Sequence, residues 1–195
     1  MAGITPTKVY APVPVQSTTT GAVAVAPTGT TAPTDAKTAL PNTWDSGGYV
    51  SEDGIKLSVS KSFNTLRDWS HSAVKNVLTE YDGTIAVDFL QVDEFSAKRV
   101  FGTDNVTKTA ATTTAGEQLK VSIGTDLPPV ESWCFSMKDG DARVRVYVPN
   151  GQITEINEIS FTTDGVKVGG TLATYDDGTG HSIYVIFDDG KVASA

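Results

Sequence analysis

The chain has 195 residues, enough for one full domain or for one domain with an additional arm. Its 39% hydrophobic residues can fill a normal core, and its 19% charged residues are too few for a disordered protein. The formal net charge of −8 argues against tight binding to nucleic acid, because such binding depends on basic residues that neutralise phosphates.

Cysteine usage and apolar runs exclude further classes of protein. The single cysteine, Cys134, rules out an intrachain disulfide and a zinc site built from cysteines. No apolar run approaches the roughly 18 residues of a membrane span. The first residues, Met1 to Pro6, lack the basic region and apolar core of a signal peptide. We therefore expect a soluble protein made in a cytoplasm, with no membrane partner.

Residues 1–43 differ in composition from everything after them. They are rich in Ala, Thr, Val and Pro, and six prolines forbid a helix and interrupt any central strand. Such an arm is extended and mobile when it is alone, so we expect neighbouring subunits to order it. The sequence thus predicts an extended N-terminal arm over 1–43 and a folded β-domain over 44–195.

Alternating apolar and polar residues predict strands through most of the β-domain. The clearest run places Ile55, Leu57, Val59 and Phe63 on one face of a strand, and Lys56, Ser58, Ser60 and Ser62 on the other. Further strands are expected at 72–80, 85–89, 119–123, 133–137, 144–148, 153–161, 166–175 and 183–187.

The stretch from Trp133 to Glu155 is the most regular part of this pattern. Its two strands flank Lys138-Asp139-Gly140-Asp141, a turn sequence typical of β-hairpins because Asp-Gly tolerates positive φ. Pro149-Asn150-Gly151 is expected to stop the second strand. The apolar phase changes between Ile153 and Ile156, which predicts a bulge or bend. Asp-Gly pairs are expected to mark strand ends at 53, 82, 139, 164, 177 and 189.

Only residues 92–102 have the pattern of a helix. Asp93 can cap its start, Phe95, Val100 and Phe101 form an apolar stripe, and Gly102 can end it. One short helix among eight or nine strands predicts a mainly β fold, a sandwich or barrel with a single flanking helix.

No candidate chemical site has the spacing that its chemistry needs. Ser58-x-x-Lys61 and Ser72-x-x-Lys75 match the Ser-x-x-Lys pair of some acyl enzymes, but residues i and i+3 of a strand point to opposite faces. His71 and His181 lack a metal-ligand spacing to each other or to Cys134. We therefore expect no catalytic residue, no cofactor and no metal, and hence no enzyme.

Charged residues near the strand ends also have ordinary structural explanations. The acidic loops 176–180 and 188–190 lack the Asp-x-Asp-x-Asp-Gly series with a distal Glu that binds calcium, so we expect turns. Arg143 and Arg145 are expected to pair with acidic neighbours. The polar strand faces rich in Ser, Thr and Asn either are simply solvated or line a wet passage.

Several blocks of residues, in a consistent order, carry a resemblance to a known family. They are Gly48–Ile55, Leu66–Trp69, Thr79–Tyr81, Ile85–Leu90, Val100–Gly102, Trp133–Glu155 and Phe187–Gly190. Together they resemble the major tail proteins (tail tube proteins) of long-tailed (siphovirus) bacteriophages, especially those that infect actinobacteria. The resemblance covers about Trp44 to Ala195, and its motifs are scaffold motifs rather than catalytic ones.

This resemblance implies a structural virion protein with a tail-tube β-sandwich. Hexameric rings of such subunits stack head to tail into a hollow tube, assembled in the host cytoplasm, and the tube becomes part of the phage tail. The implied partners are further copies of the chain, the tape-measure protein and tail-end proteins, and DNA passes through the lumen during genome ejection without specific binding. The candidates for a lumen-facing strand face are Ser58, Ser60, Ser62 and Asn64.

A second class of function stays open on sequence grounds. A virion-surface β-sandwich could instead bind a carbohydrate or a receptor. Such modules usually present clustered exposed aromatic side chains. Trp44, Trp69 and Trp133 are dispersed along the chain, which counts against this alternative.

Overall fold

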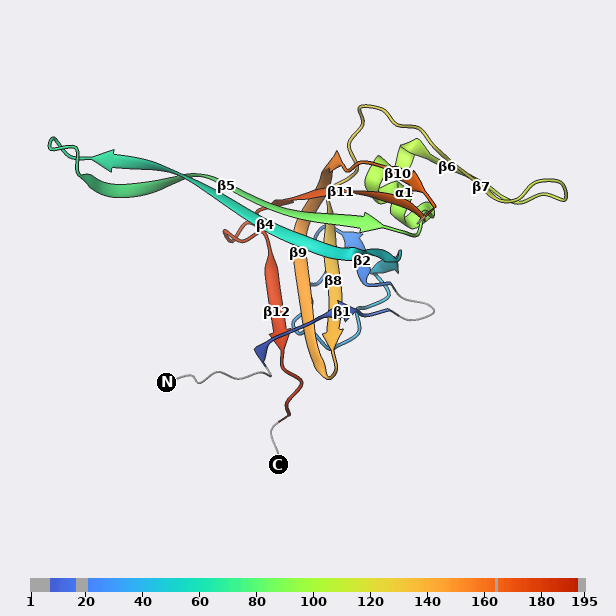
Figure 1. Ribbon diagram of the computed structural model, residues 1–195, viewed down its shortest axis with the longest axis horizontal. Coiled ribbons are helices and arrows are strands. Elements are labelled where there is room, and N and C mark those ends of the chain that lie inside the picture. Colours follow the sequence, from blue (N-terminus) through green and yellow to red (C-terminus); the bar gives the residue numbers. More distant parts are fainter. Residues whose placement is uncertain (1–7, 17–20, 164, 193–195) are drawn as a thin grey trace.

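The computed structural model describes residues 8–16, 21–163 and 165–192. Figure 1 shows a compact β-body from which two ribbons project in different directions. The elements in chain order are β1 (Val13–Pro14), β2 (Val23–Pro27), β3 (Asp45–Gly47), β4 (Val50–Arg67), β5 (Ala73–Phe89), α1 (Glu94–Phe101), a short 3₁₀ helix (Thr103–Asn105), β6 (Val106–Thr109), β7 (Gln118–Val121), β8 (Glu131–Asp139), β9 (Ala142–Ile156), β10 (Ser160–Thr162), β11 (Gly165–Tyr175) and β12 (Tyr184–Asp188).

A single large sheet forms the body, and it bends back on itself to make the predicted sandwich. Its strand order is β3-β2-β8-β9-β11-β5-β4, with β1 paired to β8, β12 to β9 and β10 to β11. In Figure 1, strands β8, β9 and β12 run across the direction of β4, β5 and β11. The first half of β9 pairs with β8 and β12 and its second half with β11, so β9 belongs to both layers.

The core lies between these layers and is closed at one end by α1. Its largest buried side chains come from distant parts of the chain, and they include Phe89, Trp133 and Phe135. Helix α1 contributes Ala97, Val100 and Phe101 to the same core. The mainly β fold with one flanking α-helix, expected from the sequence, is confirmed in the part of the chain that the structure describes.

Helix α1 begins and ends as the sequence predicts. The Asp93 carboxylate accepts a hydrogen bond from the Ser96 amide at 2.9 Å, and the Ser96 hydroxyl accepts one from the Asp93 amide at 3.0 Å, so two amides at the helix start that lack a helical partner are satisfied. Gly102 ends the helix at φ 93°, a conformation that favours glycine. Neither this helix nor the 3₁₀ helix, among the described residues, is long and apolar enough to span a membrane.

The N-terminal segment differs from the expected arm. Strand β2 lies between β3 and β8, and its Val23 and Val25 are fully buried in the core. Alternating Val and Ala suit a buried strand, and Pro27 lies only at its end, where no further ladder bond is needed. The described residues before 44 therefore pack on the β-domain of their own chain; residues 1–7 and 17–20 of the expected arm lie outside the described part.

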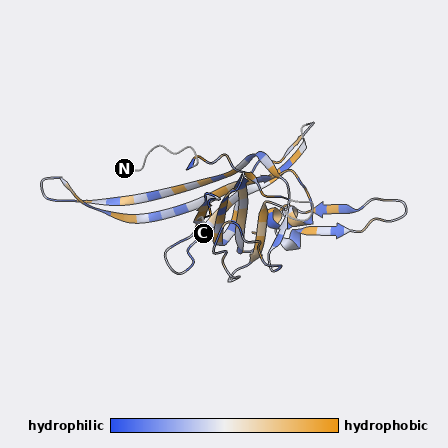
Figure 2. Cartoon of the chain, turned by 90° about the horizontal axis from the view of Figure 1, so that it is seen from below, coloured by the Kyte–Doolittle hydropathy of each residue, from blue (hydrophilic) through white to orange (hydrophobic). Residues whose placement is uncertain are grey.

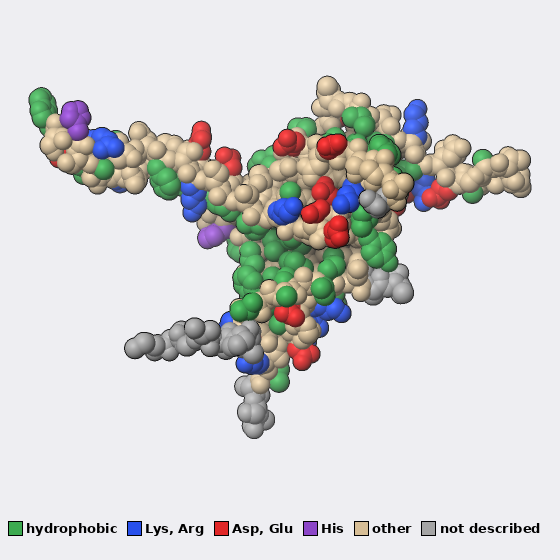
Figure 3. All heavy atoms as spheres, in the orientation of Figure 1, with side chains coloured by type: hydrophobic (Ala, Val, Ile, Leu, Met, Phe, Trp, Pro, Cys, Tyr) green, Lys and Arg blue, Asp and Glu red, His purple; other side chains and the backbone are tan. Residues whose placement is uncertain are grey.

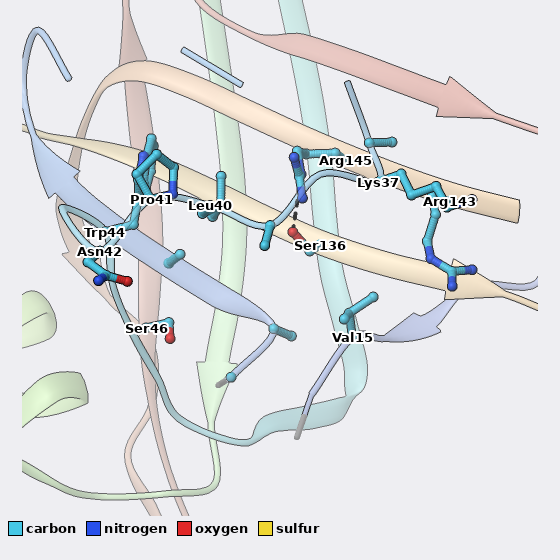
Figure 4. A pocket seen from close by; sticks show the side chains of 15 residues that line it. Val15, Lys37, Leu40, Pro41, Asn42, Trp44, Ser46, Ser136, Arg143 and Arg145 are labelled. Atoms are coloured by element: carbon cyan, nitrogen blue, oxygen red, sulfur yellow. Dashed lines mark hydrogen bonds between the residues drawn. The ribbon is translucent and has the colours of Figure 1, made fainter. Parts of the chain in front are cut away.

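Arg145 fixes the second half of this N-terminal segment. The residue is 5% exposed, and its guanidinium donates to the carbonyl oxygens of Asp35 at 2.7 Å and Thr38 at 2.9 Å, and to the Ser136 hydroxyl at 3.3 Å. Arg145 therefore donates to backbone carbonyls rather than to the acidic side chains that the sequence led us to expect. Arg143 likewise donates to carbonyls of the adjacent turn. Figure 4 shows both arginines on the wall of a cavity of about 460 Å³ under the segment.

The Asp-Gly pairs fall into two groups in the structure. Asp139-Gly140 forms the predicted β8–β9 turn, with Gly140 at φ 57°, and the pairs at 177 and 189 follow the ends of β11 and β12. In contrast, Asp53-Gly54 lies inside β4 and Asp82-Gly83 inside β5. A Cβ on Gly83 would lie 2.5 Å from the Thr174 hydroxyl oxygen, so this glycine permits close strand packing rather than a turn. The pair at 164 includes a residue outside the described part.

Strand β9 passes through the expected stop at Pro149. Trp133 pairs with Val148 and Glu131 with Gly151, so Pro149 lies in a bulge, where its missing amide costs no ladder bond. The predicted irregularity farther along is confirmed, because the pairing of β9 with β11 shifts between Ile153 and Glu155.

Replacing Val25 by Ala tests whether the N-terminal segment belongs to the core. We expect Val25→Ala to lower the free energy of unfolding by about 2 kcal/mol, because it leaves a cavity beside Trp133. Val13→Ala, at a side chain 53% exposed in β1, should change it by less than about 0.5 kcal/mol. Urea unfolding of both variants checks this, and equal midpoints for the two would contradict it.

Candidate functional site

The longest ribbon consists of β4 and β5, which pair antiparallel from the body to their connecting turn. The inner part of β5 is buried, whereas almost every side chain from 56 to 82 is exposed. Figures 1 and 2 show the outer half extending away from the body without any other element beside it. The sequence predicted separate strands at 72–80 and 85–89, but they form one continuous strand.

One face of the ribbon is polar and contains all four residues predicted to face a lumen. Ser58, Ser60, Ser62 and Asn64 are exposed and alternate along β4, so their side chains point to the same side. The first three lie opposite residues of β5 that are also polar, in the pairs Ser58–Thr84, Ser60–Asp82 and Ser62–Glu80. The two carboxylates make this middle stretch of the face acidic, whereas Lys56 and Lys75 lie on the same face to either side of it.

The other face of the ribbon is apolar except for Lys61, whose ammonium lies 5.8 Å from the centroid of the Tyr81 ring. Ile55 does pack on the core, but Leu57, Val59 and Phe63 are 41%, 47% and 55% exposed. Strand β5 extends this surface with two further exposed side chains, Leu78 and Tyr81. We call these five exposed residues the apolar stripe; exposed apolar surface of this kind marks a protein–protein contact.

A bulge in β5 keeps the stripe continuous. Ser62 pairs with Glu80 and Phe63 with Leu78, so Thr79 has no partner on β4. This extra residue reverses the alternation of β5 and brings Leu78 to the same face as Tyr81. Without it, Leu78 would point to the polar face.

The tip of the ribbon is a tightly hydrogen-bonded turn that displays one tryptophan. The Asp68 carboxylate accepts from the amides of Ser70 at 3.0 Å and Ser72 at 2.8 Å, and from the Ser70 hydroxyl. These hydrogen bonds lower the pKa of the Asp68 carboxyl, and the bond from the Ser70 hydroxyl has the largest effect. The turn is therefore intact at neutral pH and loosens as the pH falls through the lowered pKa. Trp69 itself is fully exposed, at 102%.

The ribbon also leaves a backbone edge open. β4 is the terminal strand of the large sheet, so one side of its 18 residues makes no ladder bond with any other strand in the described part of the subunit. Open edges of this length are templates for pairing with another chain. Nothing in the sequence pattern indicated that β4 would be terminal, because strand order depends on tertiary contacts.

The residues considered for chemistry are not brought together. Ser58 and Lys61 lie on opposite faces of β4, and His71 and His181 lie on separate loops. Burial raises the pKa of the Cys134 thiol to about 11, which keeps it unreactive. In the part of the chain that the structure describes, no three His, Cys, Asp or Glu side chains form a group that could hold a metal ion.

The acidic loops and the tryptophans complete this survey. In the 176–180 loop, Asp176 and Asp177 accept from the amides of Gly178 and Thr179, so these carboxylates close a turn. Trp44 and Trp133 are 6% and 1% exposed, so the three tryptophans form no exposed aromatic platform for a sugar.

The Asp68 turn provides a test of how rigidly the tip is held. Asp68→Ala removes the acceptor of the Ser70 and Ser72 amides, so we expect these amides to exchange with deuterium about five- to tenfold faster. Asp82→Ala, a matched loss of an exposed carboxylate on the same ribbon, should leave them unchanged. Hydrogen exchange measured by NMR gives the answer, and identical rates at the tip in all three proteins would contradict it.

A family model described as phage tail tube protein matches residues 14–195, which is nearly the whole chain. No curated protein matches it.

Proposed function

The chain belongs to the phage tail tube protein family, and we propose that its subunits form hexameric rings that stack into the tube through which the phage genome is ejected. Membership makes it a structural protein of the phage tail that assembles with copies of itself. In this proposal the tube encloses the tape-measure protein during assembly and meets tail-end proteins at its ends, and the host cytoplasm is where it assembles.

The observation that carries the proposal is the incomplete burial of the β4–β5 ribbon. A two-stranded ribbon is marginal in water without a third strand or a packed face. Here the apolar stripe and the open edge of β4 are both exposed in the single subunit. A ring in which each ribbon joins the sheet of its neighbour covers both and closes the sheets into a barrel, which leaves no free edge.

The polar face of the same ribbon suits the wall of the channel. It points away from the core side, where Ile85 and Val87 are buried, so closure of the ring can leave it in contact with water. Ser58, Ser60, Ser62 and Asn64 supply neutral groups there, and Asp82 and Glu80 supply negative charge. Lys56 and Lys75 lie on the same face toward the base and the tip, but the stretch between them gives DNA phosphates no cation to bind, so this part of the wall does not retain the genome.

Electron microscopy of the purified protein tests the assembly itself. Tubes with sixfold symmetry and a central channel are the expected result. Monomers alone, at concentrations where phage tails form, would contradict the proposal. A density map that shows the ribbon on the tube exterior would contradict its place in the wall.

Lysine substitutions on the polar face test the channel. We expect Ser58→Lys with Ser60→Lys to permit tube assembly, because both positions are exposed, but to lower infectivity at least about tenfold as cations facing the lumen retain DNA. The matched control is Ser58→Thr with Ser60→Thr, which adds no charge and suits a strand. Plaque counts in a phage that depends on the supplied protein measure the effect, and unchanged counts for the lysine variant would show that these residues are not lumenal.

A further inference from the structure

We propose that Trp69 of one subunit inserts into an apolar pocket at the base of β4 in another subunit. This contact rests on the proposed function in one respect, that its partner is a second copy of this chain. The pocket lies where β1, β2, the start of β4 and β8 meet, and it has a volume of about 270 Å³. Its apolar walls come from Pro12, Val13, Val23, Ile55, Phe135 and Met137.

The inserting residue is presented at low entropic cost. Trp69 is fully exposed at the end of the ribbon, and the Asp68 hydrogen bonds hold the turn that carries it. The Arg67 guanidinium donates to the His71 carbonyl at 2.9 Å and closes the turn from its other side. A large aromatic side chain on a rigid support loses little freedom on binding, which is the property of an interface anchor. The space-filling view shows this hydrophobic end at the far left of the molecule (Figure 3).

The pocket lacks one hydrogen-bond donor that an indole supplies. Ser51 lines the pocket and is 4% exposed, and its buried hydroxyl has no hydrogen-bond partner among the described residues. Buried hydroxyls are normally paired, because an unpaired one costs free energy. Tryptophan combines a large apolar body with a single N–H donor, so an inserted Trp69 fills the pocket and satisfies Ser51 together.

Charge at the two surfaces is also complementary. Arg67 lies two residues before Trp69 at the tip, and the exposed Glu52 lines the pocket at its rim. Insertion of the indole brings these opposite charges to the same boundary. Such rim pairs contribute little affinity, but they select the orientation of the approach.

The geometry of β4 excludes insertion within one subunit. Ile55 borders the pocket and Arg67 ends the same strand, and strand residues rise roughly 3.3 Å each, so the two ends lie about 40 Å apart. The inserting residue and its pocket therefore stand at opposite ends of one rigid element. A contact between unlike surfaces of identical chains is heterologous and repeats from subunit to subunit.

Tryptophan fluorescence tests the insertion in the unmodified protein. Trp44 and Trp133 are buried, so iodide quenching of unassembled subunits reports on Trp69. We expect the quenchable fraction to fall at least about threefold on assembly. Trp69→Phe should show little quenching in either state. Wild-type tubes in which Trp69 stays as quenchable as in the free subunit would overturn the proposal while leaving the tube itself established.

Chemical cross-linking tests the pairing of the two ends without altering Trp69 or Ser51. Ser70→Cys and Glu52→Cys place thiols beside the inserting residue and on the pocket rim, and the buried Cys134 does not compete for the reagent. With a short bismaleimide, the double variant should give a covalent ladder of many subunits, and each single variant at most a dimer. Intact tubes of the double variant without a ladder would overturn the contact.

Removal of the Trp69 indole measures how much this contact contributes to tube assembly. Trp69→Ala should raise the concentration needed for tube assembly about thirtyfold, the change that corresponds to the roughly 2 kcal/mol of an aromatic hot spot. Val192→Ala, at another highly exposed apolar side chain, is the control and should leave it within about twofold. An equal response of both variants would overturn a specific role for Trp69.

Discussion

The constraint on which this structure depends is that a two-stranded ribbon cannot bury itself. More than half of the β4–β5 pairing lies beyond strand β11 of the body, and the ribbon exposes an apolar stripe, an open backbone edge and a tip tryptophan to water. Each of these is unfavourable in an isolated subunit and favourable in contact with a second one. The body, in contrast, is stable by itself, because the apolar side chains of the inner part of β5 are buried in its core. Membership in a tail tube family explains this combination, because a subunit that assembles with copies of itself needs both a stable body and an exposed ribbon that can contact another subunit.

Local signals in the sequence predicted those parts of the fold that local interactions determine. Asp93, Ser96 and Gly102 act within one helix, and Asp139-Gly140 acts within one turn, so both were predicted correctly. Gly83 and Pro149 were misread as marks of strand ends, because their roles are tertiary. Gly83 gives Thr174 room to approach, and Pro149 occupies a bulge opposite β8. The burial of β2 was not foreseen for the same reason, since composition does not reveal that β8 offers an edge for Val23 and Val25.

The candidate site was predictable in its alternation but not in its surroundings. The period of two correctly grouped Ser58, Ser60 and Ser62 apart from Leu57 and Val59. It could not show that Leu57 and its neighbours lie beyond the core, because burial depends on where the other strands end. The bulge at Thr79 has no sequence signature, although it decides which face receives Leu78. The tip and the pocket were likewise invisible, since neither is defined by residues close together in the chain.

The pleat of the ribbon also limits how such a protein can diverge. Adding or removing two residues in each strand keeps every side chain on its face, whereas a single residue exchanges the polar and apolar faces from that point to the tip. The reach of the ribbon can therefore change during evolution only in increments of about 7 Å. Thr79 and Val74 are exceptions in the outer ribbon, because each is an unpaired residue accommodated by a local bulge. We therefore expect homologous proteins with ribbons of different length to differ by an even number of residues in each strand.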